Sequence, residues 1–347
     1  MAQLDLFADA DTPDEPPAPP RELPAHLPPA PAPVTITAQP RRRLSAVETE
    51  LRSYFPAQIG RPGAVAFDIA EAVSSAWHQA HGGSAIEVPL GVVATLALWP
   101  LRGPDAPLAA SWWLSLNDDQ LLVAFRECWA RWWIMRPDLI DRATPLHKWI
   151  DEETLDTRRV KAVRAVVGAA LTRGLLHLTS SEDAYFRSTA DVMGSLLAVM
   201  RSPGRAAALA EVHTPPDLAE MMAVMLLADM QLEPGMRFDE PTGGTGAMYR
   251  ALAQAMRDRA CNPHDFGWAL TDIDPLAAAG AAVNAIVWDL GPHVLIACAD
   301  TLQDANPYAK AAQDARESIE RRDRLHSQAA FLAAIKQTEA LIRRIAA

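Results

Sequence analysis

Cysteine is scarce in this sequence: Cys128, Cys261 and Cys298 are the only three among 347 residues. Their odd number, wide spacing and apolar surroundings argue against both a disulfide framework and a metal site. Long apolar runs are also missing. The longest candidates, such as residues 92–101, stop near ten residues, whereas a membrane-spanning helix needs about 20. The N-terminus is acidic where a secretory signal would be basic. These absences predict a cytoplasmic protein with reduced thiols and no membrane partner.

Basic side chains are in short supply as well. The sequence has 32 Lys and Arg residues against 43 Asp and Glu residues, which leaves a net charge of −11. A protein that binds DNA by itself needs a basic surface to contact the phosphates. The basic groups at 41–43 and 158–164 have a spacing that is typical of a solvated helix face. We therefore expect any contact with DNA to be made through a partner subunit.

Proline, in contrast, is abundant near the N-terminus, where residues 12–40 contain eleven of the 28 prolines. Such a stretch forms a semi-extended spacer and cannot build a packed core. The composition therefore predicts a disordered tail over residues 1–43.

Residues 44–205 have the periodicity of helices. Apolar residues recur at three- and four-residue intervals, most clearly at 69–77, 121–133, 157–171 and 190–200. This pattern predicts a helical N-terminal domain. Tryptophan is concentrated in it, at Trp112, Trp113, Trp129, Trp132, Trp133 and Trp149. Interleaved arginines leave a base-stacking surface open as an alternative, but a tryptophan-rich helical core is the preferred interpretation.

After residue 206 the pattern changes to alternating helices and short strands. The expected strands lie near 236–239, 268–271 and 294–297, and the expected helices over 217–230, 247–259 and 275–284. This β-α-β-α-β order is typical of an α/β fold whose parallel sheet binds a ligand at the carboxyl ends of the strands. The predicted α/β domain spans residues 206–308. A long helix or a helical pair is expected over residues 309–347.

Each predicted strand is followed by residues suited to a nucleoside ligand. The first runs into E-P-T-G-G-T-G at 240–246, where glycines let the backbone approach a ligand at a helix N-terminus. The second ends at Asp272, which can accept both ribose hydroxyls, and Ile273 can then lie against an adenine. Asp300 closes the third strand and can accept a hydrogen bond from the adenine amino group. Together these strand ends predict a nucleoside-containing cofactor.

These motifs resemble those of the N6-adenine DNA methylase family, especially the modification subunits of type I restriction-modification systems. EPTGGTGAM at 240–248 resembles the family's D-P-A-C-G-T-G-G-F, TDIDPLA at 271–277 its acid-I-D-P strand end, and ADTL at 299–302 its G-D-[ST]-L. Upstream, VHTP at 212–215 resembles the F-T-P element that caps the cofactor site. DVMGSL at 191–196 resembles the D-x-L-G-x-x-Y helix that joins the two domains.

The resemblance implies a Rossmann-like methyltransferase core that binds S-adenosyl-L-methionine and transfers a methyl group to adenine N6 in DNA. In such a core, Glu240 and the glycine turn would hold the methionine part of the cofactor. Asp272 would fix the ribose and Asp300 the adenine. His213 stands in place of an aromatic residue and can still stack on the adenine. The residues that match the cofactor motifs are His213, Thr214, Pro215, Glu240, Pro241, Thr242, Gly244, Gly246, Asp272, Ile273 and Asp300.

The sequence departs from the family at the catalytic loop. In the family, [DNS]-P-P-[YFW] follows a fourth strand, binds the target amino group and stacks on the flipped base. The only candidate here is Asn306-Pro307-Tyr308, which lacks one proline. Only five residues separate it from Asp300, too few for another helix and strand. A loop that caps the last helix is the preferred alternative. With no target-recognition domain after it, the core is predicted to be truncated.

A second resemblance lies at the extreme N-terminus. Gln3, Leu4, Asp5, Leu6 and Phe7 resemble the bacterial sliding-clamp-binding pentapeptide Q-L-[SD]-L-F. In such a peptide, the leucine and phenylalanine enter an apolar pocket while the glutamine forms hydrogen bonds at its rim. The DNA polymerase sliding clamp is therefore a possible partner. An arbitrary amphipathic terminus is the alternative.

Three functions stay open at this stage. The leading hypothesis is a DNA adenine-N6 methyltransferase. The second is a non-catalytic module that binds S-adenosylmethionine or a partner methylase, and the third is a relic that binds neither. A fourth strand beside the first would favour the enzyme. A first strand at the edge of the sheet, or one covered by the C-terminal helix, would favour the module.

Overall fold

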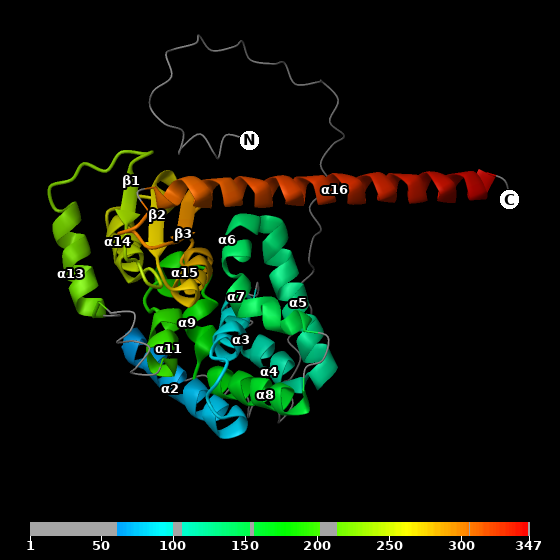
Figure 1. The fold of residues 1–347 in the computed structure, drawn as a ribbon, viewed down its shortest axis with the longest axis horizontal. Coiled ribbons are helices and arrows are strands. Elements are labelled where there is room, and N and C mark those ends of the chain that lie inside the picture. Colours follow the sequence, from blue (N-terminus) through cyan, green and yellow to red (C-terminus); the bar gives the residue numbers. More distant parts are fainter. Residues whose placement is uncertain (1–60, 100–105, 153–155, 202–213, 305, 346–347) are drawn as a thin grey trace, which may run out of the picture.

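The computed structural model describes residues 61–99, 106–152, 156–201, 214–304 and 306–345. The predicted tail, its clamp-binding pentapeptide and His213 lie outside these ranges. The described chain is mostly helical, with one small parallel sheet (Figure 1). No helix in these ranges combines the length and the apolar character that crossing a membrane requires.

The N-terminal half of the described chain consists of helices. They are α2 (Pro62–His81), α3 (Glu87–Ala97), α4 (Ala106–Ser115), α5 (Asp118–Met135), α6 (Pro137–Arg142), α7 (Thr144–His147), the 3-10 helix η4 (Lys148–Asp151), α8 (Thr157–Thr172), α9 (Leu175–Thr179), α10 (Ala184–Arg187) and α11 (Val192–Met200). The helices predicted from apolar spacing at 121–133 and 157–171 are confirmed as α5 and α8. Helix α5 begins at a capping box, in which Asn117 and Gln120 each accept a backbone N–H of the other.

The tryptophans of this half mostly form its core. Trp77, Trp113 and Trp149 are fully buried, and Trp129 is nearly so. Trp113 packs edge-on against Phe125, with ring centroids 5.4 Å apart. The prediction of a tryptophan-rich core is thereby confirmed. Trp99, Trp132 and Trp133 are partly buried and pack against this core, whereas Trp112 stays 40% exposed.

The C-terminal half contains the predicted parallel sheet. Its elements are α13 (Pro216–Leu227), β1 (Arg237–Glu240), α14 (Ala247–Asp258), the 3-10 helix η5 (Pro263–Asp265), β2 (Gly267–Asp272), α15 (Pro275–Val287), β3 (Val294–Cys298) and α16 (Pro307–Ile345). The strands lie in the order β1-β2-β3, and both neighbouring pairs are parallel. The predicted order of elements and strand direction are therefore confirmed. The carboxyl ends of all three strands lie next to one another at one end of the sheet, which is called the carboxyl edge below.

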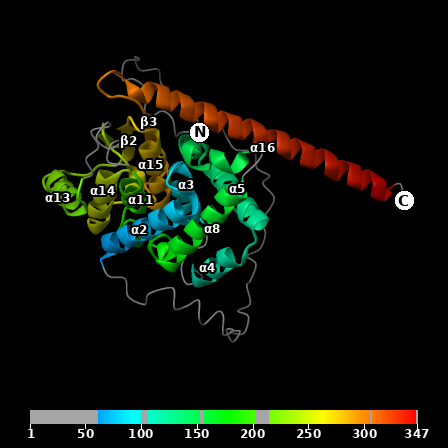
Figure 2. The same cartoon turned by 60° about the horizontal axis from the view of Figure 1, so that its bottom comes forward.

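Helices α15 and α16 cover opposite faces of this sheet. Val294 and Ile296 of β3 belong to the main core, which also contains the buried residues of α15. Leu295 and Ala297 point the other way and pack on Ala311 and Ala312 of α16 in a second cluster. This alternation follows from the period of two in a strand. The last predicted segment is one continuous helix, and its C-terminal part projects beyond the rest of the molecule (Figures 1 and 2).

Candidate functional site

The glycine-rich turn after β1 lies directly against the end of β2. The Gly243 N–H donates to the carbonyl of Thr271 at 2.9 Å. The Gly244 N–H donates to Oδ2 of Asp272 at 2.8 Å. Two motifs that are 28 residues apart in the sequence thus meet at the carboxyl edge of the sheet, as the sequence predicts.

The backbone conformation at position 246 favours glycine. Gly246 precedes α14 in a left-handed conformation with φ of 94°, which side chains disfavour. A Cβ atom there would also lie 3.2 Å from the ring of Trp288. The turn therefore enters α14 abruptly, and the first N–H groups of that helix follow directly after it. Such a helix N-terminus favours a bound negative group.

Two aspartates at the end of β2 have different roles. Asp272 accepts the Asp274 N–H on Oδ1 at 2.8 Å, so each of its carboxylate oxygens already binds one backbone amide. A carboxylate at the end of the second strand is the group with which such folds bind ribose hydroxyls. Asp274 caps α15 by accepting the Ala277 N–H at 3.1 Å, and it forms a buried ion pair with Arg201. Between them Ile273 is 52% exposed. It offers an apolar surface beside the acid.

Asp191 ties the helical half to the glycine turn. Its Oδ2 accepts the Thr245 hydroxyl at 2.6 Å, and its Oδ1 accepts the side-chain amide of Asn284 at 2.8 Å. Asn284 donates as well to the Thr245 carbonyl at 2.9 Å. Gly194 lies where a Cβ would come within 2.3 Å of the Asp191 carboxylate. The D-x-x-G pattern at 191–194 therefore supports the turn.

Asn284 and Arg201 were not anticipated from the sequence, although both hold the turn's neighbours in place. A signal existed for Asn284, because it is the only polar side chain in α15. For Arg201 the sequence carried no comparable signal, since its partner Asp274 is 73 residues away.

Glu240 is the acid at the end of β1, and it is half-buried. Burial raises the pKa of its carboxyl above the ordinary value, and a hydrogen bond from the Thr242 N–H opposes that shift. Asp239 next to it raises the pKa further by charge repulsion. Burial disfavours the ionised form of Glu240, and a positively charged ligand group beside it would stabilise that form.

The remaining predicted cofactor residues lie in three short segments. Pro241 and Thr242 are exposed in the turn after Glu240. Thr214 and Pro215 immediately precede α13, where the Pro215 carbonyl accepts the Ala219 N–H at 3.0 Å. Asp300 binds its own turn, because it accepts the Leu302 N–H at 3.0 Å and the Gln303 side chain at 2.7 Å.

The residues predicted as a catalytic loop form the start of α16. Asn306 Oδ1 accepts the Ala309 N–H at 3.1 Å, which is helix capping. Pro307 is the first residue of the helix. The Tyr308 hydroxyl donates to Asp239 and lies 3.2 Å from the Ala269 carbonyl on the face of the sheet. The preferred alternative, a loop that caps the last helix, matches this geometry.

We expect these residues to contribute to stability rather than to cofactor binding. Asn306→Ala should lower the free energy of unfolding by about 1 kcal/mol through loss of the cap. Tyr308→Phe should lower it by about 0.5–1.5 kcal/mol through loss of hydrogen bonds. Denaturant unfolding measures both changes. Methyl transfer that Asn306→Ala abolishes without loss of stability would contradict this prediction.

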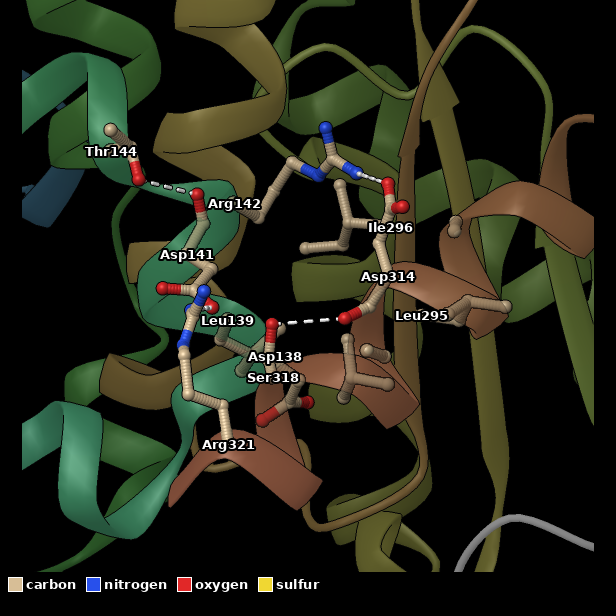
Figure 3. Close-up of a pocket in the computed structure, with 13 residues that line it drawn as sticks. Asp138, Leu139, Asp141, Arg142, Thr144, Leu295, Ile296, Asp314, Ser318 and Arg321 are labelled. Atoms are coloured by element: carbon tan, nitrogen blue, oxygen red, sulfur yellow. Dashed lines mark hydrogen bonds and ion pairs between the residues drawn. The ribbon is translucent and has the colours of Figure 1, made fainter. Parts of the chain in front are cut away.

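Two cavities adjoin α16, and neither is lined by residues at the carboxyl ends of the strands. One, of about 330 Å³, lies between α6, the beginning of β3 and α16. Figure 3 shows Arg142 reaching from α6 to Asp314 of α16, 3.6 Å away. Arg321 of α16 likewise pairs with Asp141. The other cavity, of about 610 Å³, lies between α5, η4 and α16, with Trp129, Trp133 and Leu325 among its lining residues. The site at the carboxyl ends of the strands is defined instead by the hydrogen bonds described above.

Comparison of this chain with models of protein families, with curated proteins and with solved structures found no match.

Proposed function

We propose that this protein binds S-adenosylmethionine at the carboxyl edge of its sheet, in the manner of a Rossmann-like methyltransferase. The observation that carries the proposal is the contact of the glycine turn with Asp272, beside the exposed Ile273. An acid at the end of the second strand, next to a close backbone turn, is how such folds bind the ribose of a nucleoside. The motif resemblance points to the same cofactor.

The residues present fit the chemical groups of this cofactor. Asp272 offers a carboxylate, which is the acceptor that the two ribose hydroxyls need, at the end of the second strand. Ile273 offers an apolar side chain to the flat adenine ring. Glu240 offers a carboxylate, disfavoured by burial in the free protein, to the positively charged methionine end. The bound cofactor would supply an electrophilic methyl group, while these side chains would hold and orient it.

We further propose that methylation of adenine in DNA requires a partner subunit, so that this chain acts as the cofactor-binding module. Within the described residues, β1 pairs with β2 alone and forms an edge of the sheet. Asn306 and Tyr308 serve α16 rather than a loop after a fourth strand. Both observations favour a module over a self-sufficient enzyme. The net charge of −11 likewise favours DNA contact through a partner.

Calorimetric titration of the full chain with S-adenosylmethionine tests the proposal. We expect one saturable site per chain and little methyl transfer to unmethylated DNA by the protein alone. A wild-type protein that gives no saturable binding would overturn the proposed function. Substantial methylation by the isolated chain would leave cofactor binding intact but refute its role as a module.

Binding should also depend on pH through Glu240. Because burial raises the pKa of this carboxyl, part of the free protein is protonated as the pH falls toward the ordinary carboxyl range. A nearby ammonium group lowers that pKa again, so binding should release a proton and affinity should rise as pH rises through the raised value. Calorimetry in buffers of different ionisation enthalpy measures the released proton.

Glu240→Gln should remove this pH dependence of the affinity, whereas Glu339→Gln on the exposed part of α16 should retain it.

The raised pKa of Glu240 also affects folding stability. A carboxyl with a raised folded-state pKa costs stability as pH rises from its unfolded value through its folded value. Glu240→Gln should therefore unfold at a higher denaturant concentration than wild type at neutral pH. A pH-independent affinity in the wild type would remove Glu240 from the site.

Binding of the sliding clamp by Gln3, Leu4, Asp5, Leu6 and Phe7 is a separate proposal from the sequence, because these residues lie outside the described ranges. A flexible tether of the predicted kind would raise the local concentration of the module near DNA. This would offset the weak DNA affinity expected of an acidic chain.

A further inference from the structure

Helix α13 is apolar on almost every side, yet most of it is exposed. Only Ala219, Ala223 and Leu227 are buried, and they face α14. Six large apolar side chains remain exposed by 42–67%: Leu218, Met221, Met222, Val224, Met225 and Leu226. A helix that is apolar all round is normally buried on all sides. Exposed apolar patches of this kind mark surfaces where another molecule binds.

Four of these six exposed residues form an ordered stripe. Leu218, Met221, Met222 and Met225 are spaced i, i+3, i+4 and i+7, so they lie on one helix face. At 100° per residue, this stripe is nearly opposite the face formed by Ala219, Ala223 and Leu227. It therefore points away from α14. Methionine side chains are flexible and polarizable, and they are common on helix faces that bind partners.

The charged residues of α13 and of the segment that follows it are all acidic. Between residues 214 and 236 the sequence has four acids, Asp217, Glu220, Asp229 and Glu233, and no lysine or arginine. All four are exposed. Within the part of the chain that the structure describes, only Glu220 forms an ion pair, with Arg250 on α14 at 2.9 Å. An apolar stripe with an acidic rim is complementary to an apolar surface with a basic rim. It is less suited to a second copy of itself, since two acidic rims would then face each other.

We propose that α13 is the docking surface for a partner protein that presents a basic amphipathic helix or an apolar face with a basic rim. Figure 1 places α13 at the end of the molecule where the sheet stops at β1. The surface exists whether or not the strand ends bind a cofactor. This partner and the subunit that supplies the catalytic loop for the target base can be one protein. Only that identification rests on the proposed function.

A synthetic helical peptide with leucines on one face and lysines on the other serves as the probe. Fluorescence anisotropy with the full-length protein should show saturable binding that weakens as salt is raised. The paired substitution Met221→Gln and Met225→Gln leaves the charge and the helix propensity nearly unchanged. It should weaken peptide binding at least about tenfold, because the anchors of such an interface are its apolar side chains.

Two controls separate this surface from others. Phe331→Gln, at an exposed apolar position of α16, should bind the peptide as wild type does. A peptide with the same leucines but glutamates in place of lysines should bind at least about tenfold more weakly. Equal affinity of the paired methionine variant and wild type would overturn the proposal, as would a loss caused by Phe331→Gln.

Sedimentation of the protein alone tests the alternative occupant. We expect a monomer. A dimer that the paired methionine substitution dissociates would assign α13 to a second copy and refute the basic partner. Calorimetry with S-adenosylmethionine on the same variant should give wild-type affinity, so failure of the docking surface and failure of the cofactor site are distinguishable.

Discussion

Asp272→Ala is expected to weaken S-adenosylmethionine binding at least about tenfold. Removing a charge-assisted hydrogen bond to a ligand costs about 1.5–3 kcal/mol, and this carboxylate can bind both ribose hydroxyls. The substitution acts in a second way too. It removes the acceptor of the Gly244 N–H and of the Asp274 N–H, so the glycine turn loses its support at the end of β2. Isothermal calorimetry on the wild type and the variant measures the change.

Two further variants make this result specific. Glu339→Ala removes an acid from the exposed part of α16 and should leave the affinity unchanged. Asp272→Asn keeps one oxygen acceptor but loses the charge, so its affinity should fall between those of wild type and Asp272→Ala. Wild-type affinity in Asp272→Ala would show that the cofactor, if it binds, does not use the end of β2.

Asp274→Ala should lower the free energy of unfolding by about 3–5 kcal/mol. Asp274 and Arg201 form an ion pair in which both side chains are almost completely buried, at 3% and 2% exposure. Removing the acid takes a buried carboxylate away from a buried guanidinium, which is the costly way to break such a pair. The variant also loses the N-cap of α15. Urea unfolding followed by circular dichroism gives the difference.

A double-mutant cycle separates the ion pair from the cap. Arg201→Leu combined with Asp274→Leu should cost less than the sum of the two single changes, because both buried charges of the pair are then removed together. Glu320→Ala on α16 is the matched surface control. Its partner Arg324 lies 3.6 Å away and both side chains are exposed, so the cost should be within about 0.5 kcal/mol. A similarly small effect of Asp274→Ala would mean that the Arg201 side chain is not held in its buried position next to residue 274.

Local sequence was sufficient to predict most of the helices and the order of the strands. Apolar spacing identified α5, α8 and α14, because one helix face must be buried and the helical repeat then appears in the sequence. The β-α-β-α-β order implied a parallel sheet, since short strands joined through helices run in the same direction. Parallel strands bring their carboxyl ends together, so the turn at 240–246 was expected to lie near Asp272. The structure confirms this contact.

Contacts between distant segments could not be predicted in the same way. Asn284 binds Asp191 across 93 residues, and Arg201 pairs with Asp274 across 73. No local pattern selects such partners, because each side chain is only one of many polar groups until the fold brings two of them together. The tertiary structure also decided the role of Asn306 and Tyr308, which depends on where α16 begins and what it covers.

The sequence by itself therefore determined the elements whose cause is local: helices with one apolar face, a parallel sheet, and a polar or glycine residue at each strand end. Only the tertiary structure decided what is exposed. The sequence predicts a helix over residues 217–230 without saying which of its apolar side chains are buried, and it predicts one helix or two over residues 309–347. In the fold, α13 keeps a methionine stripe in solvent and α16 projects beyond the sheet. Burial depends on neighbours from elsewhere in the chain, and no local periodicity specifies whether those neighbours are present.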